Sequence, residues 1–423
     1  MEKTYEAADE VEKVILIGVS TYENDDTEES LEELRELVKT AGAETVATVI
    51  QNREAVHSGT YIGKGKIEEV KILIDELGAT GVICDDELSP AQLKNLRDML
   101  ETKVMDRTLV ILDIFAARAR TGEGKIQVEL AQLKYRQSRL VGYGKSLSRL
   151  GGGIGTRGPG EKKLEIDRRL IKDRIAVLKR QVEEIKVHRE LARNQRSKNP
   201  TTVISIVGYT NAGKSTLLNE LTGAAVIEED KLFATLDPTT RNYRLESGQE
   251  IMLTDTVGFI RKLPHHLVDA FRSTLEEAKY ADILIHVVDA SNPRMDIQMH
   301  TVYETLSSLG VTDKPIITIF NKQDRVRELM AAENKNDMSV YRDFKADYIL
   351  NASIKKHEGL DKLLEYIEEI LRNQKVFIAK TFDYSKAGEI QRIRKYGELL
   401  KEEYREEGIY VEAYVPIEIM PGN

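Results

Sequence analysis

The stretch that most constrains the fold lies between residues 202 and 221. An apolar run at 202–207 leads into Gly-Tyr-Thr-Asn-Ala-Gly-Lys-Ser at 208–215, and residues with helical spacing follow. Strand, glycine loop and helix in this order form the setting in which G-x-x-x-x-G-K-S binds phosphates. Backbone N–H groups and the positive end of the helix dipole face the anion. A chance Gly-Lys-Ser turn would not explain the flanking strand and helix.

The residues of this loop take distinct expected roles. Lys214 should reach the β- and γ-phosphates as a catalytic cation, and Ser215 should ligate Mg²⁺. Asn211 either helps to bind K⁺ beside the phosphates or only caps the loop, and the sequence leaves both open. The expected phosphate contacts are Gly208, Tyr209, Thr210, Asn211, Ala212, Gly213, Lys214, Ser215 and Thr216.

Two segments between 232 and 258 complete the expected magnesium and γ-phosphate site. Residues 251–258 read as a strand ending in Asp-Thr-Val-Gly, where Asp255 should hold Mg²⁺ through water and the Gly258 N–H should bind the γ-phosphate. The preceding polar segment should supply a threonine that closes over the metal, and Thr235 is favoured over Thr239 and Thr240. The other candidate contacts here are Phe233, Ala234, Leu236, Asp237, Thr256 and Val257.

A third motif selects the base. The strand at 316–320 delivers Asn321, Lys322, Gln323 and Asp324, the N-K-x-D pattern. An aspartate carboxylate can accept two hydrogen bonds from guanine, whereas adenine would leave that carboxylate unpaired. The last base-contacting loop is expected at Ala352, Ser353 and Ile354. The set predicts GTP and GDP as ligands.

The residue after Gly258 is Phe259, whose side chain cannot hydrogen-bond a water. The attacking water must therefore be positioned by another group, so slow hydrolysis is expected until a partner acts. Supplying a missing catalytic group is worth on the order of 10³–10⁵ in rate. Arg241, Arg244 and Arg261 are nearby cations, and the sequence does not choose among them.

Composition narrows the class of protein. The chain has 423 residues, 41% of them hydrophobic and 31% charged, with a formal net charge of -9. Such a chain folds into several packed domains, and its acidic balance argues against a simple nucleic-acid coat. Cys84 is the sole cysteine, which excludes an internal disulfide. Neither a signal peptide nor a run of about 20 apolar residues is visible, so a cytoplasmic protein without stable membrane insertion is expected.

Four regions follow from the pattern of apolar residues. Residues 1–120 alternate strands and helices, which predicts an α/β lobe with a parallel sheet. Residues 121–200 predict two antiparallel helices, with Ile126, Leu130, Leu133 and Leu140 facing a seam of Leu164, Ile171, Ile175, Leu178, Val182 and Ile185. Residues 201–372 hold the nucleotide motifs. Residues 373–423 predict a βαβ unit with a strand at 376–382, a helix at 387–407 and a strand at 409–415.

A glycine-rich segment at 142–160 joins the two expected helices and carries Lys145, Arg149 and Arg157. The second helix is rich in Lys and Arg although the chain is acidic. This asymmetry favours contact with RNA phosphates, while the alternative is a solvated helix face. The Tyr-Ile-Gly-Lys-Gly-Lys segment at 61–66 is interpreted as a structural turn rather than a second anion site. His57, His265, His266 and Cys84 lack metal-ligand spacing and are interpreted as structural.

The motifs together resemble the HflX GTPases of the translation-factor-related Obg–HflX group. The resemblance rests on G-Y-T-N-A-G-K-S at 208–215, L-F-A-T-L-D-P-T-T-R at 232–241, D-T-V-G-F at 255–259 and S-R-L-G-G-G-I-G-T-R-G-P-G-E at 148–161. Segments 106–119 and 128–135 also look like the family. The resemblance is strong over about 10–260 and looser beyond, where Ser353-Ile354-Lys355 replaces the usual Ser-Ala.

The resemblance implies an α/β fold: a P-loop GTPase domain preceded by an α/β lobe and an antiparallel helical hairpin, with a small C-terminal α+β unit. It implies a GTP hydrolase that binds the large ribosomal subunit and ribosomal RNA, is stimulated there, and remodels or splits ribosomes. Segment 142–160 would then reach RNA in the ribosomal catalytic centre. ATP binding has been proposed for the family's N-terminal part, without residues that can be carried over. A monomer is expected away from the ribosome.

Two other functions stay open. One is an RNA or ribosome-assembly GTPase whose basic hairpin holds immature RNA. The other is a switch that recruits proteins and does not contact RNA, in which case charge reversal at Arg149, Arg157, Arg168 and Arg169 would leave partner affinity unchanged.

Overall fold

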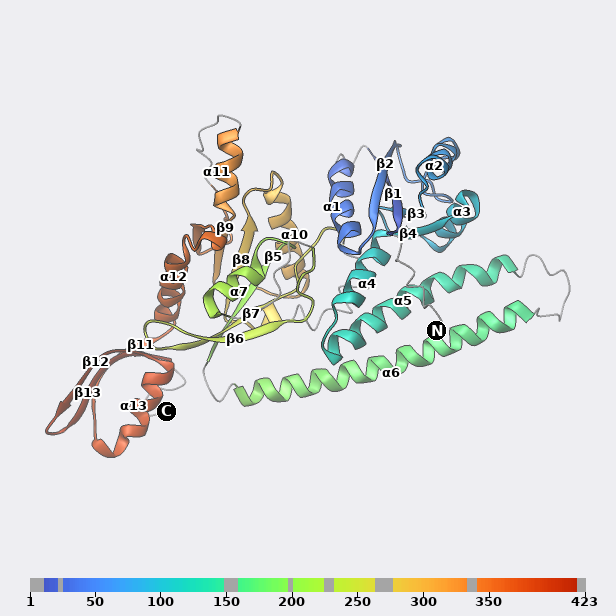
Figure 1. Cartoon of the computed structure of the whole chain (residues 1–423). Coiled ribbons are helices and arrows are strands. Elements are labelled where there is room, and N and C mark those ends of the chain that lie inside the picture. Colours follow the sequence, from blue (N-terminus) through green and yellow to red (C-terminus); the bar gives the residue numbers. More distant parts are fainter. Residues whose placement is uncertain are drawn as a thin grey trace, which may run out of the picture. The chain divides into compact units, whose positions relative to one another are not determined.

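The computed structural model describes residues 11–21, 26–147, 159–196, 201–223, 232–262, 277–332 and 341–416 (Figure 1). The chain divides into two compact units. The first contains Met1–Glu183 together with Lys262–Ala270, and the second contains Glu184–Arg261 together with Phe271–Asn423. Several expected features lie outside the described residues: the central part of the glycine-rich segment with Arg149 and Arg157, and His265 and His266.

The N-terminal lobe is built on a parallel sheet of order β2-β1-β3-β4. Its elements in chain order are β1 (Lys13–Ser20), α1 (Thr27–Thr40), β2 (Glu44–Asn52), α2 (Lys64–Leu77), β3 (Gly81–Cys84), α3 (Pro90–Leu100) and β4 (Lys103–Asp106). Every strand pair is parallel, as strands alternating with helices predict. Cys84 is fully buried in the sheet, so it is part of the core.

Local signals explain where these elements begin. The Ser89 side chain accepts a hydrogen bond from the Gln92 N–H, and the Gln92 side chain accepts one from the Ser89 N–H. This reciprocal cap, with Pro90 in the first turn, fixes the start of α3. Segment 61–66 leads into α2, which begins at Lys64, so the predicted turn is limited to residues before it. Tyr61, at φ 66°, is buried in the lobe core.

Three helices follow the sheet: α4 (Arg107–Arg118), α5 (Gly122–Leu147) and α6 (Pro159–Arg196). Leu130 of α5 packs against Ile175 and Leu178 of α6, with Ile126, Leu133, Ile171 and Val182 around them. The Arg168 guanidinium donates to the Leu140 carbonyl, and Arg174 pairs with Glu129. Residue numbers therefore run in opposite directions along the two helices. The predicted antiparallel seam is therefore confirmed at these positions. The expectation that the connecting loop begins at Gly142 is wrong, because α5 continues to Leu147.

The nucleotide motifs lie on a six-stranded sheet of order β10-β9-β8-β5-β7-β6 (Figure 1). Its elements are β5 (Thr202–Gly208), α7 (Lys214–Thr222), β6 (Thr239–Arg244), β7 (Glu250–Asp255), α9 (Glu277–Tyr280), β8 (Ile283–Asp289), α10 (Met295–Ser308), β9 (Ile316–Asn321), α11 (Gln323–Ala332), β10 (Tyr348–Asn351), η1 (Ile354–Lys356) and α12 (Leu360–Asn373). All neighbours are parallel except β6 and β7. The phosphate loop leaves β5 at the centre of the sheet. Thr239 and Thr240, the two rival threonines, begin β6.

The C-terminal part differs from the predicted βαβ unit. It contains β11 (Val376–Phe382), η2 (Tyr384–Lys386), α13 (Ala387–Tyr396), β12 (Glu398–Arg405) and β13 (Gly408–Val415), in an antiparallel sheet of order β11-β13-β12. The predicted helix at 387–407 is therefore wrong in its second half. Gly397, with extended backbone, ends α13, and residues 398–405 pair with β13 instead. Glu, Leu and Lys favour a helix locally, but cross-strand pairing outweighs this weak preference.

Among the described helices, none is both long enough and apolar enough to span a membrane.

Candidate active site

The loop between β5 and α7 requires glycine at two positions. Gly208 has φ 152°, and a Cβ there would lie 2.3 Å from the Val287 carbonyl oxygen of β8. Gly213 has φ 105°, and its Cβ would lie 2.4 Å from Nδ2 of Asn321. At Gly208 the close neighbour is backbone, which cannot shift cheaply, and at Gly213 it is the buried, hydrogen-bonded amide of Asn321. The positive φ at both positions also disfavours any residue with a side chain. The loop is thereby pressed against β8 and the base-binding segment, with the N-terminus of α7 open to the cavity.

Lys214 occupies the first turn of α7 and is only 6% exposed. Its Nζ donates to the Tyr209 carbonyl oxygen at 2.7 Å. Burial lowers the pKa of Lys214 to about 8, an effect that Asp255 opposes and Lys322 reinforces. An anion entering this site would stabilise the ammonium, because an opposite charge at close range favours the charged form.

Ser215, Thr235 and Asp255 converge from three separate segments. Ser215 Oγ lies 2.7 Å from Asp255 Oδ2 and 2.7 Å from Thr235 Oγ1. Burial raises the pKa of Asp255, although Lys214 and the two hydroxyls oppose the rise. Among the described residues, Asp255 Oδ1 is buried without a hydrogen-bond partner. Hydroxyl and carboxylate oxygens with an unsatisfied buried lone pair fit a hard divalent cation such as Mg²⁺.

The two other threonine candidates lie elsewhere. Thr239 is the first residue of β6 and pairs with Asp255 across the strands through the backbone register. The Thr240 hydroxyl lies 3.0 Å from the Thr254 hydroxyl. Of the three threonines, the structure brings Thr235 to Ser215, and the turn that presents it includes Phe233 at φ 56°.

The segment after β7 is held on the phosphate loop by its backbone. The Phe259 N–H donates to the Gly208 carbonyl at 3.1 Å, and the Thr210 N–H donates to the Phe259 carbonyl at 2.8 Å. The Phe259 side chain is 2% exposed, so it packs in the interior and does not face the phosphates. A Cβ on Gly258 would lie 2.9 Å from Lys214 Nζ. The backbone of Gly258 thus passes directly beside the Lys214 ammonium.

The base-binding segment is tied to both neighbouring loops. The Asn321 amide donates to the Ala212 carbonyl at 2.9 Å and accepts from the Ile354 N–H at 3.1 Å. The Ser353 hydroxyl donates to Asp324 Oδ1 at 2.7 Å. Burial raises the pKa of Asp324, but Ser353 and backbone donors outweigh it, so the pKa lies below the usual value. Asp324 therefore stays ionised, which is the state in which the sequence predicts it to accept two guanine N–H bonds.

A cavity of about 350 Å³ joins these parts. It is lined by Thr210, Asn211, Gly213, Lys214, Ser215, Thr216, Glu220, Phe233, Ala234, Thr235, Thr256, Gly258, Asn321, Lys322, Asp324, Arg325, Ile354 and Lys355. Two other sequence candidates do not line the cavity but are hydrogen-bonded to residues that do. Asp255 accepts from Ser215, and Ser353 donates to Asp324. The Tyr209 hydroxyl accepts from the Arg261 N–H at 2.8 Å, so this side chain contacts the segment after β7 and does not line the cavity. Gly208, Ala212, Leu236, Asp237, Val257, Gln323 and Ala352 are absent from the lining.

Sequence reasoning missed four residues of this region. Glu220, Arg325 and Lys355 line the cavity. Asp289, at the end of β8, accepts from Lys322 Nζ at 2.6 Å, which holds Lys322 at φ 64°. A carboxylate directly after an apolar strand was the available signal for Asp289, because the carboxyl ends of parallel strands meet at one edge.

Three family models match successive parts of the chain. They are described as GTP-binding GTPase N-terminal at residues 28–116, GTP-binding GTPase Middle Region at 118–196, and 50S ribosome-binding GTPase at 203–322.

Curated relatives match between about three quarters and almost all of the chain. A protein named GTPase HflX from Lacrimispora saccharolytica is 64% identical over 96% of this chain and 94% of the relative. One of the same name from Caldanaerobacter subterraneus subsp. tengcongensis is 50% identical over 98% and 93%. The Escherichia coli K12 protein of that name is 44% identical over 77% and 76%.

Solved structures were also matched. A crystal structure of a GTP-binding protein from Sulfolobus solfataricus with GDP is 27% identical and covers 85% of this chain and 98% of that chain, with a TM-score of 0.44.

Proposed function

Since the chain belongs to the HflX family of GTPases and hydrolyses GTP, we propose that it is a magnesium-dependent, ribosome-stimulated GTPase that remodels or splits ribosomes. The observation that carries the chemical part is the convergence of Ser215, Thr235 and Asp255 around an unpartnered carboxylate oxygen. The partner is suggested by the family description, a 50S ribosome-binding GTPase, which matches residues 203–322. Action on ribosomes would place the protein in the cytoplasm.

The proposed mechanism assigns each group a task in phosphoryl transfer. Lys214 and the loop N–H groups hold the β- and γ-phosphates, and the Gly258 N–H binds the γ-phosphate. Ser215 and Thr235 would hold Mg²⁺ directly and Asp255 through water. When bound, Mg²⁺ neutralises charge that develops on the phosphate oxygens. The short Ser215–Thr235 contact keeps the segment around Thr235 near the site, ready to close over nucleotide.

The base is selected at the other end of the cavity. Asp324 would accept from the guanine ring N–H and its exocyclic amine, while Ser353 fixes the carboxylate at 2.7 Å. Asn321 contributes by position, because its amide joins the phosphate loop to the segment that begins η1. Guanine recognition and phosphate binding are therefore mechanically connected through one buried side chain.

The buried Phe259 supports the proposed stimulation by a partner. Its side chain is buried and has no hydrogen-bonding group, so it cannot orient the attacking water. A group from the ribosome, or a rearrangement that the ribosome induces, would supply this function. The large subunit is the proposed partner, with binding through α6, where Lys and Arg outnumber Asp and Glu although the chain carries a net charge of -9.

The decisive experiment is steady-state GTP hydrolysis with and without purified large ribosomal subunits, at fixed Mg²⁺ and K⁺. We expect a rise of at least about tenfold, within the range that a completed active site supplies. The Lys214→Ala variant should show no rise. Tight GTP binding without stimulation would contradict the proposal.

The alternative is a GTPase that acts on immature ribosomal RNA, favoured by the same basic helix. The two functions can be distinguished by co-sedimentation of the protein, in the presence of GTP, with mature large subunits and with immature particles. Charge reversal of the exposed Arg169 and Arg180 should weaken binding. The slope of log affinity against log salt concentration should fall by roughly one to two released counterions. Reversal of the exposed Lys39 and Lys386 is the matched control. Preference for immature particles would favour the alternative.

K⁺ dependence is proposed at Asn211. This residue lines the cavity beside the phosphate-binding lysine and has φ 61°, so its amide oxygen belongs to a loop held in an uncommon backbone conformation. GTP hydrolysis in KCl and in NaCl at equal ionic strength tests it. Faster hydrolysis in KCl, lost in Asn211→Ala, supports a K⁺ site. Equal rates would leave Asn211 as a loop cap.

A further inference from the structure

Asp106, the last residue of β4, is a buried carboxylate that the proposed mechanism does not use. It is completely shielded from solvent. Its oxygens accept from the backbone N–H groups of Leu88 at 3.1 Å and Leu109 at 3.0 Å. They also accept from two side chains of α5, the Tyr135 hydroxyl at 2.8 Å and Arg139 Nη2 at 2.6 Å. This carboxylate therefore joins α5 to the edge strand of the N-terminal sheet.

Arg139 is held in the same cluster by further contacts. Its guanidinium carbon lies 3.2 Å from the centre of the Tyr135 ring, and its Nη2 also donates to the Leu88 carbonyl at 3.2 Å. Only 8% of the residue is exposed. Asp106 begins segment 106–119 and Tyr135 ends segment 128–135, the upstream segments in which the sequence resembles the family. These two segments thus meet at one buried ion pair.

The second helix of the hairpin is attached to α5 beside this cluster. The Arg168 guanidinium of α6 donates to the carbonyl oxygen of Leu140, the residue after Arg139, at 2.6 Å. From there α5 continues to Leu147, and α6 has begun at Pro159. At a rise of 1.5 Å per residue, each helix extends about 12–14 Å from the cluster toward the connecting loop. A change of angle at the cluster is therefore amplified at the loop.

Apolar packing alone would define the direction of the hairpin poorly. The first half of α5 buries Val128 and Ala131, but apolar contacts are non-directional and tolerate small rotations. Hydrogen bonds to a buried carboxylate require particular distances and angles, and a bond left unmade there is costly. The cluster at Asp106 is therefore suited to fix the rotation and tilt of α5.

We propose that Asp106, Tyr135 and Arg139 are positioning residues that set the direction in which the hairpin projects from the N-terminal lobe, and thereby the affinity for the large ribosomal subunit. The inference rests on the proposed function, in which α6 binds that subunit. None of the three residues lines the nucleotide cavity. The fraction of molecules with a correctly directed hairpin sets the apparent affinity, because binding to a partly populated state is weakened in proportion to its population.

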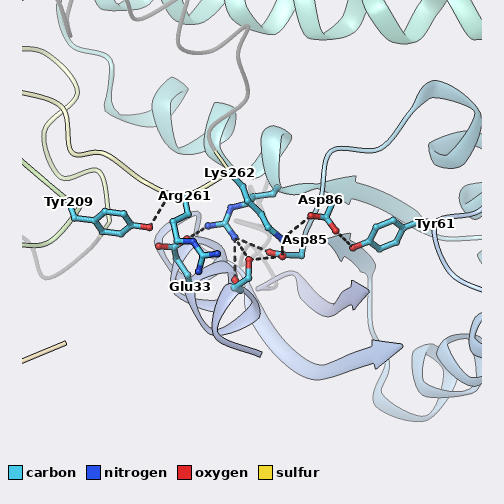
Figure 2. A network of polar contacts seen from close by, with 9 residues as sticks. Glu33, Tyr61, Asp85, Asp86, Tyr209, Arg261 and Lys262 are labelled. Carbon is cyan, nitrogen blue, oxygen red and sulfur yellow. Dashed lines mark hydrogen bonds and ion pairs between the residues drawn. The ribbon is translucent and has the colours of Figure 1, made fainter. Parts of the chain in front are cut away.

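The neighbouring carboxylate at this edge of the sheet is engaged elsewhere and does not replace Asp106. Asp85, directly after β3, accepts from Arg107 Nη1 at 2.9 Å and from Lys262 Nζ (Figure 2). The substitution Arg139→Met keeps an apolar stem of similar length and leaves Asp106 with its other three donors. The lobe is therefore expected to stay folded in this variant, while the link from Asp106 to α5 is weakened.

The test is GTP hydrolysis by the full chain at increasing concentrations of purified large ribosomal subunits, with fixed Mg²⁺ and K⁺. Arg139→Met should raise the half-saturating subunit concentration at least about tenfold, as expected when one-tenth of the molecules direct the hairpin correctly. Tyr135→Phe should raise it by about threefold, because one hydrogen bond to a charged group is lost. The maximal stimulated rate should stay within about twofold of the wild type, since the active site is unchanged.

Tyr61→Phe is the matched control. The Tyr61 hydroxyl also donates to an aspartate of the same lobe, Asp86, at 2.7 Å. Its removal costs the lobe a comparable hydrogen bond, and the half-saturating subunit concentration should stay at the wild-type value.

A second readout measures the direction of the hairpin without ribosomes. Nitroxide labels are placed through Lys39→Cys in α1 and Leu170→Cys in α6, whose native side chains are exposed. Burial raises the pKa of the Cys84 thiol, which keeps the native cysteine unreactive. Double electron–electron resonance should give a narrow distance distribution in the otherwise unchanged chain and a broader one with Arg139→Met.

The proposal is overturned by a half-saturating concentration that Arg139→Met leaves unchanged, by an equal effect of Tyr61→Phe, or by equal distance distributions with and without Arg139→Met. If Arg139→Met does not fold, Tyr135→Phe decides by the same measurements. A wild-type protein that large subunits do not stimulate would instead refute the proposed function.

Discussion

The protonation of Lys214 gives a quantitative prediction about nucleotide affinity. Its pKa is lowered to about 8 by burial in the protein without nucleotide. Phosphates bound beside the ammonium favour the charged form and raise this pKa. Binding of GDP must therefore take up a proton at pH values above about 8, and the affinity must fall as pH rises.

The magnitude follows from the fraction of Lys214 that is protonated before binding. With a pKa of about 8, roughly nine-tenths is charged at pH 7 and one-tenth at pH 9. GDP affinity should fall about tenfold between these values, equivalent to about 1.4 kcal/mol. The same lowered pKa makes the unfolded chain bind more protons than the folded chain above pH 8. The stability of the nucleotide-free GTPase domain should therefore increase with pH in that range.

The assay is titration with a fluorescent GDP analogue from pH 7 to pH 9 at constant ionic strength and Mg²⁺. Calorimetry at pH 8 in two buffers of different ionisation enthalpy should count about half a proton taken up, as expected at a pH equal to the pKa. Lys214→Arg is the control, because arginine stays charged throughout this range. An equal pH dependence in wild type and Lys214→Arg would refute the reasoning, as would affinity that rises with pH.

Three further predictions follow from single contacts. Ser215→Ala should remove most of the Mg²⁺ dependence of nucleotide affinity, measured with and without chelator, whereas an unchanged dependence would exclude Ser215 as a ligand. Asp324→Asn should lower GTP affinity and raise affinity for xanthosine triphosphate, because xanthine has a carbonyl oxygen in place of the guanine amine and can accept from the Asn amide. Loss of affinity for both nucleotides would indicate misfolding instead. Leu178→Ala, at a fully buried position between α5 and α6, should destabilise the hairpin by about 2–5 kcal/mol in denaturant unfolding followed by helix signal, and a change below about 1 kcal/mol would show that the seam tolerates the cavity.

The nucleotide motifs could be read from the sequence because each one is short and local. Asn321 and Asp324 follow a strand within a few residues, and the strand's apolar run predicts where they emerge. Thr235 was harder, since three threonines stood in one polar segment. No local pattern separates Thr235 from Thr239 and Thr240, because the 2.7 Å contact of Thr235 with Ser215 depends on how that segment folds back.

The errors share a cause. Residues 398–405 contain good helix formers, yet they pair with β13, whose register no local pattern encodes. Asp289 was missed because its partner, Lys322, directly follows the neighbouring strand β9 and approaches only when β8 and β9 align. Loop 142–160 was expected to begin at Gly142, although the helix continues through both early glycines, at a cost of about 1 kcal/mol each that neighbouring turns can offset.

The sequence by itself predicted the chemistry: a phosphate loop, a serine hydroxyl proposed to bind Mg²⁺, an aspartate proposed to bind guanine, and the family to which the chain belongs. It could do so because strand–loop–helix units place such groups by local geometry. Only the tertiary structure decided which threonine meets Ser215, which carboxylate holds Lys322, and that Lys262 binds the aspartates after β3. The partners in these pairs are 20, 33 and 177 residues apart in the sequence. They interact only after folding has brought them together, because charge attraction acts through space.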